Sequence, residues 1–269
     1  MGDPVIFREY KAYGEGPCNI GDLFVEEGAR RLLSISGLDP EDGDTLFVIG
    51  TPWLWNLCWE SPKYQHLVRL MEERKFKRKI ALGIGSCFGW NGRIDLSLNA
   101  RRVVDLWRGF DLVVCRDEIA KSLIPDSICL PCPSLWFMDK APCTPTQGIL
   151  QINCLPWHPD YSEDNGWINP TLPILSYDNG LYRNREDLIR FLSFVLSHKK
   201  VISKRIHAIL PASPFIQTRC VPSDSRAMSC RKAMIPIHPE GQWSQPEVIL
   251  SKRNGEWLME YGTALQAFG

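Results

Sequence analysis

The residues best suited to chemistry stand late in the chain, in the run Ser203-Lys204-Arg205-Ile206-His207. They follow a short apolar stretch at 201–203 that predicts a strand, and a helical pattern begins directly after them. In α/β proteins the carboxyl end of a strand opens onto the ligand crevice, and the amino end of the next helix attracts anions. Arg205 and His207 at such a junction therefore predict a site for a small phosphorylated or carboxylated ligand.

Another cation, Arg116, follows an apolar stretch at 112–115 that predicts a buried strand. A buried guanidinium needs a partner, because a charge removed from water without one costs much free energy. Either the neighbouring Asp117 or a bound anion can supply that partner, and the sequence leaves both alternatives open. Asp117 is also placed to cap the helix that is predicted to follow it.

A glycine-containing stretch at 14–22 lies between the first expected strand and the first expected helix. Glycine lets the backbone approach a ligand closely, and Asn19 or Asp22 can cap the helix or hold a hydroxyl group. The stretch lacks both the dinucleotide fingerprint and the Walker loop. A turn that caps the helix and a binding loop are both consistent with Asn19, Gly21 and Asp22.

These residues need a scaffold, and apolar runs that alternate with helical periodicity predict an α/β fold with parallel sheets. In the first half the expected strands are 5–7, 46–50, 80–83, 112–115 and 128–130, and the expected helices are 23–34, 64–73, 96–107 and 118–124. This half resembles a Rossmann fold. In the second half we expect strands at 149–152, 174–177 and 201–203, and helices at 185–197 and after 203.

The stretch 139–147 is rich in proline and threonine and suits neither a helix nor a central strand. We therefore place a domain boundary there, with one domain at 1–140 and a smaller, more irregular one at 141–269. Because prolines are frequent from Pro214 onward, we expect the tail to form loops and short strands.

The charge composition excludes several partners. Lysine plus arginine and aspartate plus glutamate number 31 each, so the formal net charge is 0 and the chain as a whole is not drawn to nucleic acid or an anionic membrane. No apolar run approaches the ~20 residues that span a bilayer, and the first residues do not form a signal peptide. We expect a cytoplasmic protein without a transmembrane segment.

The ten cysteines are scattered through the chain, which favours free thiols in the core over disulfides. Cys129 and Cys132 form a Cys-x-x-Cys pair, but a zinc ribbon needs a second such pair. We predict no metal site. Ten tryptophans also stand out, of which Trp53 and Trp90 are the preferred candidates for stacking on a sugar ring. Core packing is the commoner fate of tryptophan.

Taken together, four segments resemble the polysaccharide pyruvyl transferases, in the same order and with similar spacing. The segments are Asn19-Ile20-Gly21-Asp22, Cys115-Arg116-Asp117-Glu118, Pro131-Cys132-Pro133-Ser134 and Ser203-Lys204-Arg205-Ile206-His207-Ala208. The resemblance implies a GT-B-like fold, with two Rossmann-like domains facing a cleft and a shortened C-terminal domain. It also implies transfer of the pyruvyl group of phosphoenolpyruvate, as a ketal, onto a sugar of a surface or exported polysaccharide, without a cofactor.

The resemblance also implies roles for individual residues. The catalytic residues would be His207, as proton shuttle, and Arg205. The donor would be bound by Arg116, Arg205, Lys204 and Ser203, and the acceptor sugar by Asn19, Gly21 and Asp22. To these acceptor residues we add Trp53 and Trp90, the two candidates for stacking on a sugar ring. The chain departs from the family at Cys132, where many members have an aspartate before the proline. Two alternatives stay open, a glycosyltransferase of the GT-B type that uses a nucleotide-sugar and a glycan-binding relative without turnover.

Overall fold

The structure is a computed structural model. It describes residues 5–8, 20–39, 42–50, 53–55, 57, 59–88, 98–152, 165–167, 185–222, 224–238 and 242–267.

The first half of the chain forms a sheet in which every strand pair is parallel. Its order is β1-β2-β4-β6-β7. The strands are β1 (Val5–Arg8), β2 (Thr45–Ile49), β4 (Arg78–Ile84), β6 (Leu112–Cys115) and β7 (Ile128–Cys129). Parallel strands covered on both faces are apolar along their whole length, and every residue of β2 and β6 is buried.

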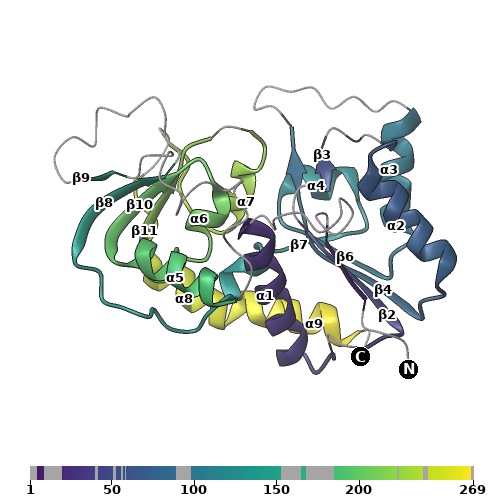
Figure 1. Ribbon diagram of the computed structural model, residues 1–269, viewed down its shortest axis with the longest axis horizontal. Coiled ribbons are helices and arrows are strands. Elements are labelled where there is room, and N and C mark those ends of the chain that lie inside the picture. Colours follow the sequence, from purple (N-terminus) through teal and green to yellow (C-terminus); the bar gives the residue numbers. More distant parts are fainter. Residues whose placement is uncertain are drawn as a thin grey trace.

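Helices cover both faces of this sheet, as alternate strand residues show. Phe47 and Ile49 pack in the same cluster as α1 (Ile20–Ile35), whereas Leu46 and Val48 pack with α2 (Pro62–Glu73) and α3 (Leu98–Arg108). Because successive side chains of a strand point to opposite faces, α1 lies on one side of the sheet and α2 and α3 on the other. This separation is visible in Figure 1.

The second half forms another parallel sheet, of order β11-β10-β8-β9. Its strands are β8 (Gln147–Ile152), β9 (Asn165–Trp167), β10 (His198–Ser203) and β11 (Gln217–Cys220). Helix α5 (Arg185–Leu196) connects β9 to β10 and packs on the sheet through buried side chains such as Leu188, Leu192 and Val195. The α/β class that the sequence predicts is confirmed by these two parallel sheets.

Helix α1 joins the two sheets. It contacts α5, the short helix α6 (Ile206–Ile209) and the 3-10 helix η2 (Pro133–Trp136), and it shares one cluster of buried side chains with both sheets. A Cβ on Gly28 of α1 would lie 1.9 Å from the carbonyl oxygen of Pro133, so only glycine permits this approach of α1 to η2. In Figure 1, α1 lies between the two sheets.

The tail differs from our expectation. It contains β11 and the short helix α7 (Ala227–Lys232), and it ends in two helices, α8 (Pro246–Asn254) and α9 (Glu256–Gln266). Pro246 occupies the first turn of α8, where a missing N–H costs nothing. In α9 the buried residues Trp257, Tyr261, Ala264 and Leu265 repeat at helical spacing. The other prolines of the tail lie before α8, and the expectation of loops and short strands is wrong for residues 246–266.

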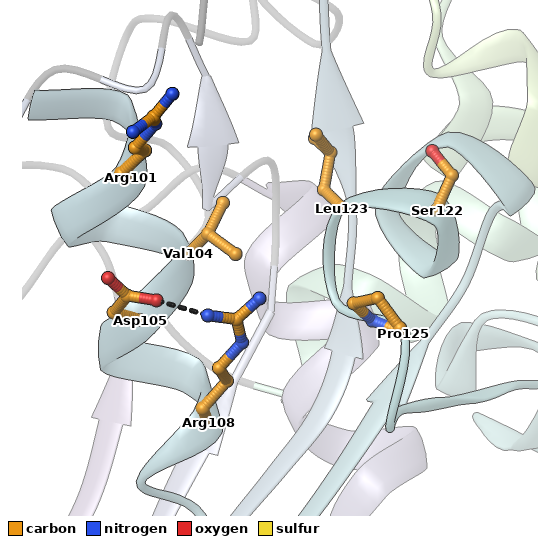
Figure 2. A pocket seen from close by; sticks show the side chains of 7 residues that line it. All are labelled: Arg101, Val104, Asp105, Arg108, Ser122, Leu123 and Pro125. Carbon is orange, nitrogen blue, oxygen red and sulfur yellow. Dashed lines mark hydrogen bonds and ion pairs between the residues drawn. The ribbon is translucent and has the colours of Figure 1, made fainter. Parts of the chain in front are cut away.

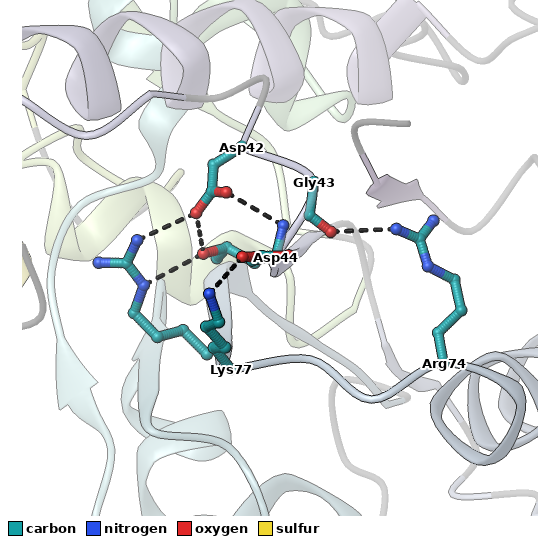
Figure 3. A network of polar contacts seen from close by, with 7 residues as sticks. Asp42, Gly43, Asp44, Arg74 and Lys77 are labelled. Carbon is teal, nitrogen blue, oxygen red and sulfur yellow. Dashed lines mark hydrogen bonds and ion pairs between the residues drawn. The ribbon is translucent and has the colours of Figure 1, made fainter. Parts of the chain in front are cut away.

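A polar network stabilises the amino ends of β2 and β4 (Figure 3). Asp42 accepts hydrogen bonds from the Thr45 hydroxyl at 2.7 Å and from Arg78 at 3.0 Å. Asp44 pairs with Lys77 at 2.6 Å, and Arg74 donates to the carbonyl of Gly43. The hydrogen bond from Thr45, with those from Asp44 N–H and Arg78, lowers the pKa of Asp42. This network lies at the opposite end of the sheet from the carboxyl ends of the strands, where Arg116 follows β6 (Leu112–Cys115).

Strand order distinguishes the first sheet from a dinucleotide-binding Rossmann sheet. Its strands add to the sheet in the order in which they occur in the chain, whereas a Rossmann sheet begins in the middle and reverses direction. The strand expected at 174–177 lies outside the described residues. Among the helices of the described ranges, none has the length and apolar character that crossing a bilayer requires.

Candidate anion-binding site

The two halves bring Arg116 and His207 together. Arg116 follows β6 directly, and His207 lies in α6, just after the end of β10. Although 91 positions separate them in the chain, Arg116 Nη1 lies 3.0 Å from His207 Nε2. The carboxyl ends of strands from both sheets therefore meet at one place, as expected for the ligand end of parallel sheets.

The guanidinium of Arg116 is fully buried, with an exposed fraction of 0%. Its Nη1 contacts His207, but Nε and Nη2 have no hydrogen-bond partner among the described residues. These two nitrogens form one edge of the planar guanidinium, and such an edge binds both oxygens of a carboxylate or phosphate. The edge thus carries the charge and the unsatisfied donors that an oxyanion binds, and the backbone of Gly85 packs against it.

Gly85 makes room for this guanidinium. A Cβ on Gly85 would lie 2.2 Å from Arg116 Nε and 2.7 Å from Nη2, closer than any real contact. Gly85 follows the last residue of β4, Ile84, and precedes the two-residue strand β5 (Ser86–Cys87). The absence of a side chain at this strand end is therefore necessary for the observed position of Arg116.

The two partners that the sequence leaves open for Arg116 can now be compared. The carboxylate of Asp117 forms no hydrogen bond with Arg116 among the described residues. It accepts hydrogen bonds from Ser86 N–H, the Ser86 hydroxyl and Ala120 N–H, at 2.8 to 2.9 Å. The bond from Ala120 confirms that Asp117 caps α4 (Glu118–Leu123). Burial raises the pKa of Asp117, and the hydrogen bonds from Ser86 and Ala120, together with the charge of Arg116, oppose this effect.

The contact with Arg116 fixes the state of His207. A guanidinium only donates hydrogen bonds, so Nε2 of His207 must accept, and the imidazole is neutral with its proton on Nδ1. Burial, together with the charges of Arg116 and Arg226, holds the pKa of His207 well below its usual range. The imidazole is thus uncharged near neutral pH as long as no anion is present.

Cys132 belongs to the same cluster. Its Sγ lies 3.8 Å from His207 Nε2 and accepts a hydrogen bond of 3.3 Å from the Ser134 hydroxyl. Its side chain is fully buried. At the position where many pyruvyl transferases have an aspartate, this chain therefore has a thiol that contacts the imidazole of His207.

A chain of hydroxyl groups fastens the two halves beside this cluster. The hydroxyls of Ser86 and Ser225 lie 2.9 Å apart, and the Ser86 hydroxyl donates to Asp117. Phe88 N–H donates to the Ser225 hydroxyl, and Ser225 N–H donates to the carbonyl of Phe88, each at 2.8 Å. Asp117 adjoins Arg116 in the chain and Ser225 adjoins Arg226, so this link connects the segments that carry the charges around His207.

The other residues of the predicted donor side lie close by in the chain. Ser203 ends β10 with a buried side chain, and its hydroxyl accepts a hydrogen bond of 2.8 Å from Arg205 N–H. Lys204 and Arg205 are half-buried, and Arg205 precedes α6. Since α6 contains only 4 residues, the helix dipole that we expected to attract an anion is weak here. Attraction must come from the side chains.

The predicted acceptor side is only partly described. Asn19 and Trp90 lie outside the described residues. Gly21 and Asp22 lie buried in the first turn of α1, which starts at Ile20, earlier than we expected. The Asp22 carboxylate, with an exposed fraction of 3%, has the sign that the amino end of a helix favours.

Trp53 is a core residue. Its exposed fraction is 0%, its ring meets Trp107 edge-on at 5.4 Å and Tyr64 at 5.9 Å, and its Nε1 donates to the carbonyl of Ile49. A sugar ring cannot stack on it, so the commoner alternative of core packing holds and Trp53 is removed from the acceptor site.

The cysteines of the described ranges are free thiols, as the sequence predicts. They are Cys87, Cys115, Cys129, Cys132, Cys143, Cys220 and Cys230.

An open pocket of about 330 Å³ lies elsewhere, between α3 and α4 (Figure 2). Arg101, Asp105 and Arg108 line one side and Ser122, Leu123 and Pro125 the other. Arg108 pairs with Asp105 at 2.5 Å, and both side chains are more than half exposed. None of the residues that the sequence predicts for a donor or acceptor site lines this pocket.

Sequence reasoning missed Gly85, Ser86, Ser225 and Arg226 as parts of this site. Gly85 and Ser86 lie within three residues of the end of the predicted strand 80–83, which is a signal that could have been used. Ser225 and Arg226 lie in the proline-containing tail, and no local pattern marks them.

No protein-family model matches the chain, and no curated protein matches it. Its structure is similar to the crystal structure of a functionally uncharacterized protein from Klebsiella pneumoniae subsp. pneumoniae NTUH-K2044. The two sequences are 15% identical, the match covers 84% of this chain and 85% of that one, and the TM-score is 0.50. At this identity the similarity shows a shared α/β fold and nothing about activity.

Proposed function

We propose that this chain is a pyruvyl transferase, which moves the pyruvyl group of phosphoenolpyruvate onto a sugar of a surface or exported polysaccharide. The observation that carries the proposal is the buried pair of Arg116 and His207, with two guanidinium nitrogens free of partners among the described residues. Phosphoenolpyruvate offers a carboxylate and a phosphate, and either group fits such a guanidinium edge. The four segments that resemble the pyruvyl transferases include both residues.

Arg116 and His207 have complementary tasks in this reaction. Arg116 holds the anionic donor through Nε and Nη2, where burial strengthens the attraction between the charges. His207 gives a proton to the methylene carbon of the donor, and a sugar hydroxyl then adds to the central carbon. Inorganic phosphate departs, and a second hydroxyl of the sugar adds to the same carbon and closes the ketal. The protons of the two hydroxyls return to the site and to solvent.

His207 must first acquire the proton that it gives, at Nε2. The hydrogen bond that this atom accepts from Arg116 must then break, because both groups would be donors. His207 is neutral in the free site, because burial and the neighbouring arginines hold its pKa well below the usual range. A phosphate or carboxylate bound on Arg116 brings negative charge toward the imidazole and raises this pKa. Binding of the donor thus favours the protonated form of His207 that acts as the general acid. When no donor is bound, the imidazole is neutral.

The test is release of inorganic phosphate from phosphoenolpyruvate in the presence of candidate glycosides. We expect His207→Gln to lower turnover by about 100-fold or more, the usual contribution of a general acid. His66→Gln changes an exposed histidine of α2 and should leave turnover unchanged. Failure of phosphoenolpyruvate to raise the melting temperature, together with stabilisation by nucleotide-sugars, would contradict the proposal.

A further inference from the structure

The pocket between α3 and α4 shares no lining residue with the anion-binding site (Figure 2). Its volume of about 330 Å³ is within the range of small-molecule sites, about 300–1,000 Å³. The α3 side of the pocket consists of residues spaced three and four apart, which share one face of a helix. They are Arg101, Val104, Asp105 and Arg108. One face of α3 thus forms a wall of this pocket.

The opposite wall is low, because α4 is short. Helix α4 ends at Leu123 after 6 residues, whereas α3 has 11. At 1.5 Å per residue α3 is about 7.5 Å longer, so α4 leaves part of its face uncovered. Beside Leu123, the opposite wall contains only the small side chain of Ser122 and the ring of Pro125. Lys121 holds the turn after α4, since its amino group donates to the carbonyls of Pro125 and Ser127.

Part of the lining is apolar. Val104 and Leu123 have exposed fractions of 8% and 9%, and the exposed ring of Pro125 lies next to them. A ligand with an apolar ring or chain would remove this surface from water, and burial of apolar surface is favourable. The pocket therefore suits a molecule with an apolar body.

The charged part of the lining has one positive charge in excess. Arg108 Nη1 lies 2.5 Å from Asp105 Oδ1, so these two charges compensate each other. Arg101 is exposed and has no hydrogen bond or ion pair among the described residues. Its guanidinium can bind both oxygens of a carboxylate. One anionic group would thus complete the charge balance of the pocket.

We propose that this pocket binds a small monoanion with an apolar body, of the class of the aryl carboxylates. The carboxylate pairs with Arg101, and the ring covers Val104, Leu123 and Pro125. A neutral molecule of the same shape gains nothing from the charge of Arg101, and a dianion leaves one of its charges without a partner. This binding is independent of Arg116 and of pyruvyl transfer.

Naphthoate and naphthamide, as the same positional isomer, provide the test, because they share the ring and differ in charge. Titrations of the full-length protein, followed by the backbone amide signals in NMR spectra, give both the affinity and the location. We expect naphthoate to bind about threefold more tightly or better, the contribution of an exposed ion pair, and to shift signals of residues 101–108 and 122–125. Arg101→Met should make the two affinities equal. Arg69→Met, which changes an exposed arginine of α2, should keep the preference.

Ser122→Phe tests the pocket without changing its charge. The hydroxyl of Ser122 is exposed and bonds only the carbonyl of Ile119 in its own helix, so the fold does not depend on it. The larger ring should fill the pocket and abolish binding of both compounds, and the Arg101→Met comparison decides if this variant does not fold. Equal affinities in the wild-type protein, a preference that survives Arg101→Met, or binding that survives in folded Ser122→Phe would overturn the inference. Signals that shift around Arg116 and His207 in place of those at the pocket would overturn it as well.

Discussion

At the residue scale, the site depends on a buried guanidinium with two nitrogens that have no partner among the described residues. Buried donors without acceptors cost about 1–3 kcal/mol each, so a protein keeps them where something binds. The neighbouring carboxylate of Asp117 does not satisfy them, because it is occupied by Ser86 and Ala120. Arg116 is therefore held ready for an anion from outside.

Gly85→Ala tests how Arg116 is positioned. The new Cβ would lie 2.2 Å from Arg116 Nε, so the guanidinium must move. We expect the affinity for inorganic phosphate, measured by calorimetry, to fall by about tenfold or more, which is a loss of about 1.4 kcal/mol. Gly262→Ala is the control, because a Cβ there meets nothing within 4 Å. Equal affinity of both variants would contradict the role of Gly85.

His207→Gln tests the protonation state through stability. The folded-state pKa of His207 is depressed below 6.5, so below that pH the unfolded chain binds a proton that the folded site does not. Wild-type stability should therefore fall as the pH falls from about 6.5 toward 5, measured by urea unfolding. The variant should show a smaller decline. Some decline remains, because burial also lowers the pKa of His198. An identical decline in both proteins would contradict a neutral His207.

At the scale of elements, the hydroxyl link between Ser86 and Ser225 holds β5 against the segment before α7. Ser225→Ala removes this link and leaves Phe88 N–H without its acceptor. We expect a loss of about 1–3 kcal/mol in the free energy of unfolding, together with weaker phosphate binding. Ser225→Thr keeps the hydroxyl and should restore both.

Ser122→Ala is the matched control, because the exposed hydroxyl of Ser122 bonds only a carbonyl of its own helix. Its effect on stability and on phosphate binding should be small. If Ser225→Ala lowers stability but leaves phosphate binding intact, the link is structural and does not position the site.

Some helices and strands could be predicted from the sequence and others could not. The strand 112–115 and the helix capped by Asp117 were predictable, since an apolar run and a capping residue are local signals. The helices α8 and α9 were not, because prolines earlier in the tail masked the helical spacing of Trp257, Tyr261 and Leu265. The resemblance implied that Arg116, Arg205 and His207 lie around one donor, whereas Ser225 entered the site only through tertiary packing.

At the scale of the whole molecule, the C-terminal helices fasten the connection between the two sheets. Arg253 of α8 is buried, and its guanidinium donates to the carbonyls of Leu135, Met138 and Asp139, at 3.2, 2.8 and 3.4 Å. Burial lowers the pKa of Arg253 to about 10, so it stays charged at neutral pH. The Tyr261 hydroxyl of α9 donates to the carbonyl of Pro131 at 2.7 Å, just before η2.

Arg253→Met should therefore destabilise the whole protein. Three carbonyl groups lose their donor, and we expect a loss of about 2–3 kcal/mol in the free energy of unfolding. Arg190→Met is the control, since the side chain of Arg190 is 80% exposed and surface pairs contribute little. Thermal unfolding measures both. A melting temperature of Arg253→Met equal to that of the control would contradict this role.

The central claim is that Arg116 and His207 hold one anion and that the imidazole gains a proton when the anion binds. Calorimetric titration with phosphoenolpyruvate near pH 7.5, in two buffers of different ionisation enthalpy, tests it directly. The account predicts binding with uptake of close to one proton, loss of that uptake in His207→Gln, and a loss of affinity of about 100-fold in Arg116→Met. Binding without proton uptake, or binding that does not depend on Arg116, would contradict it.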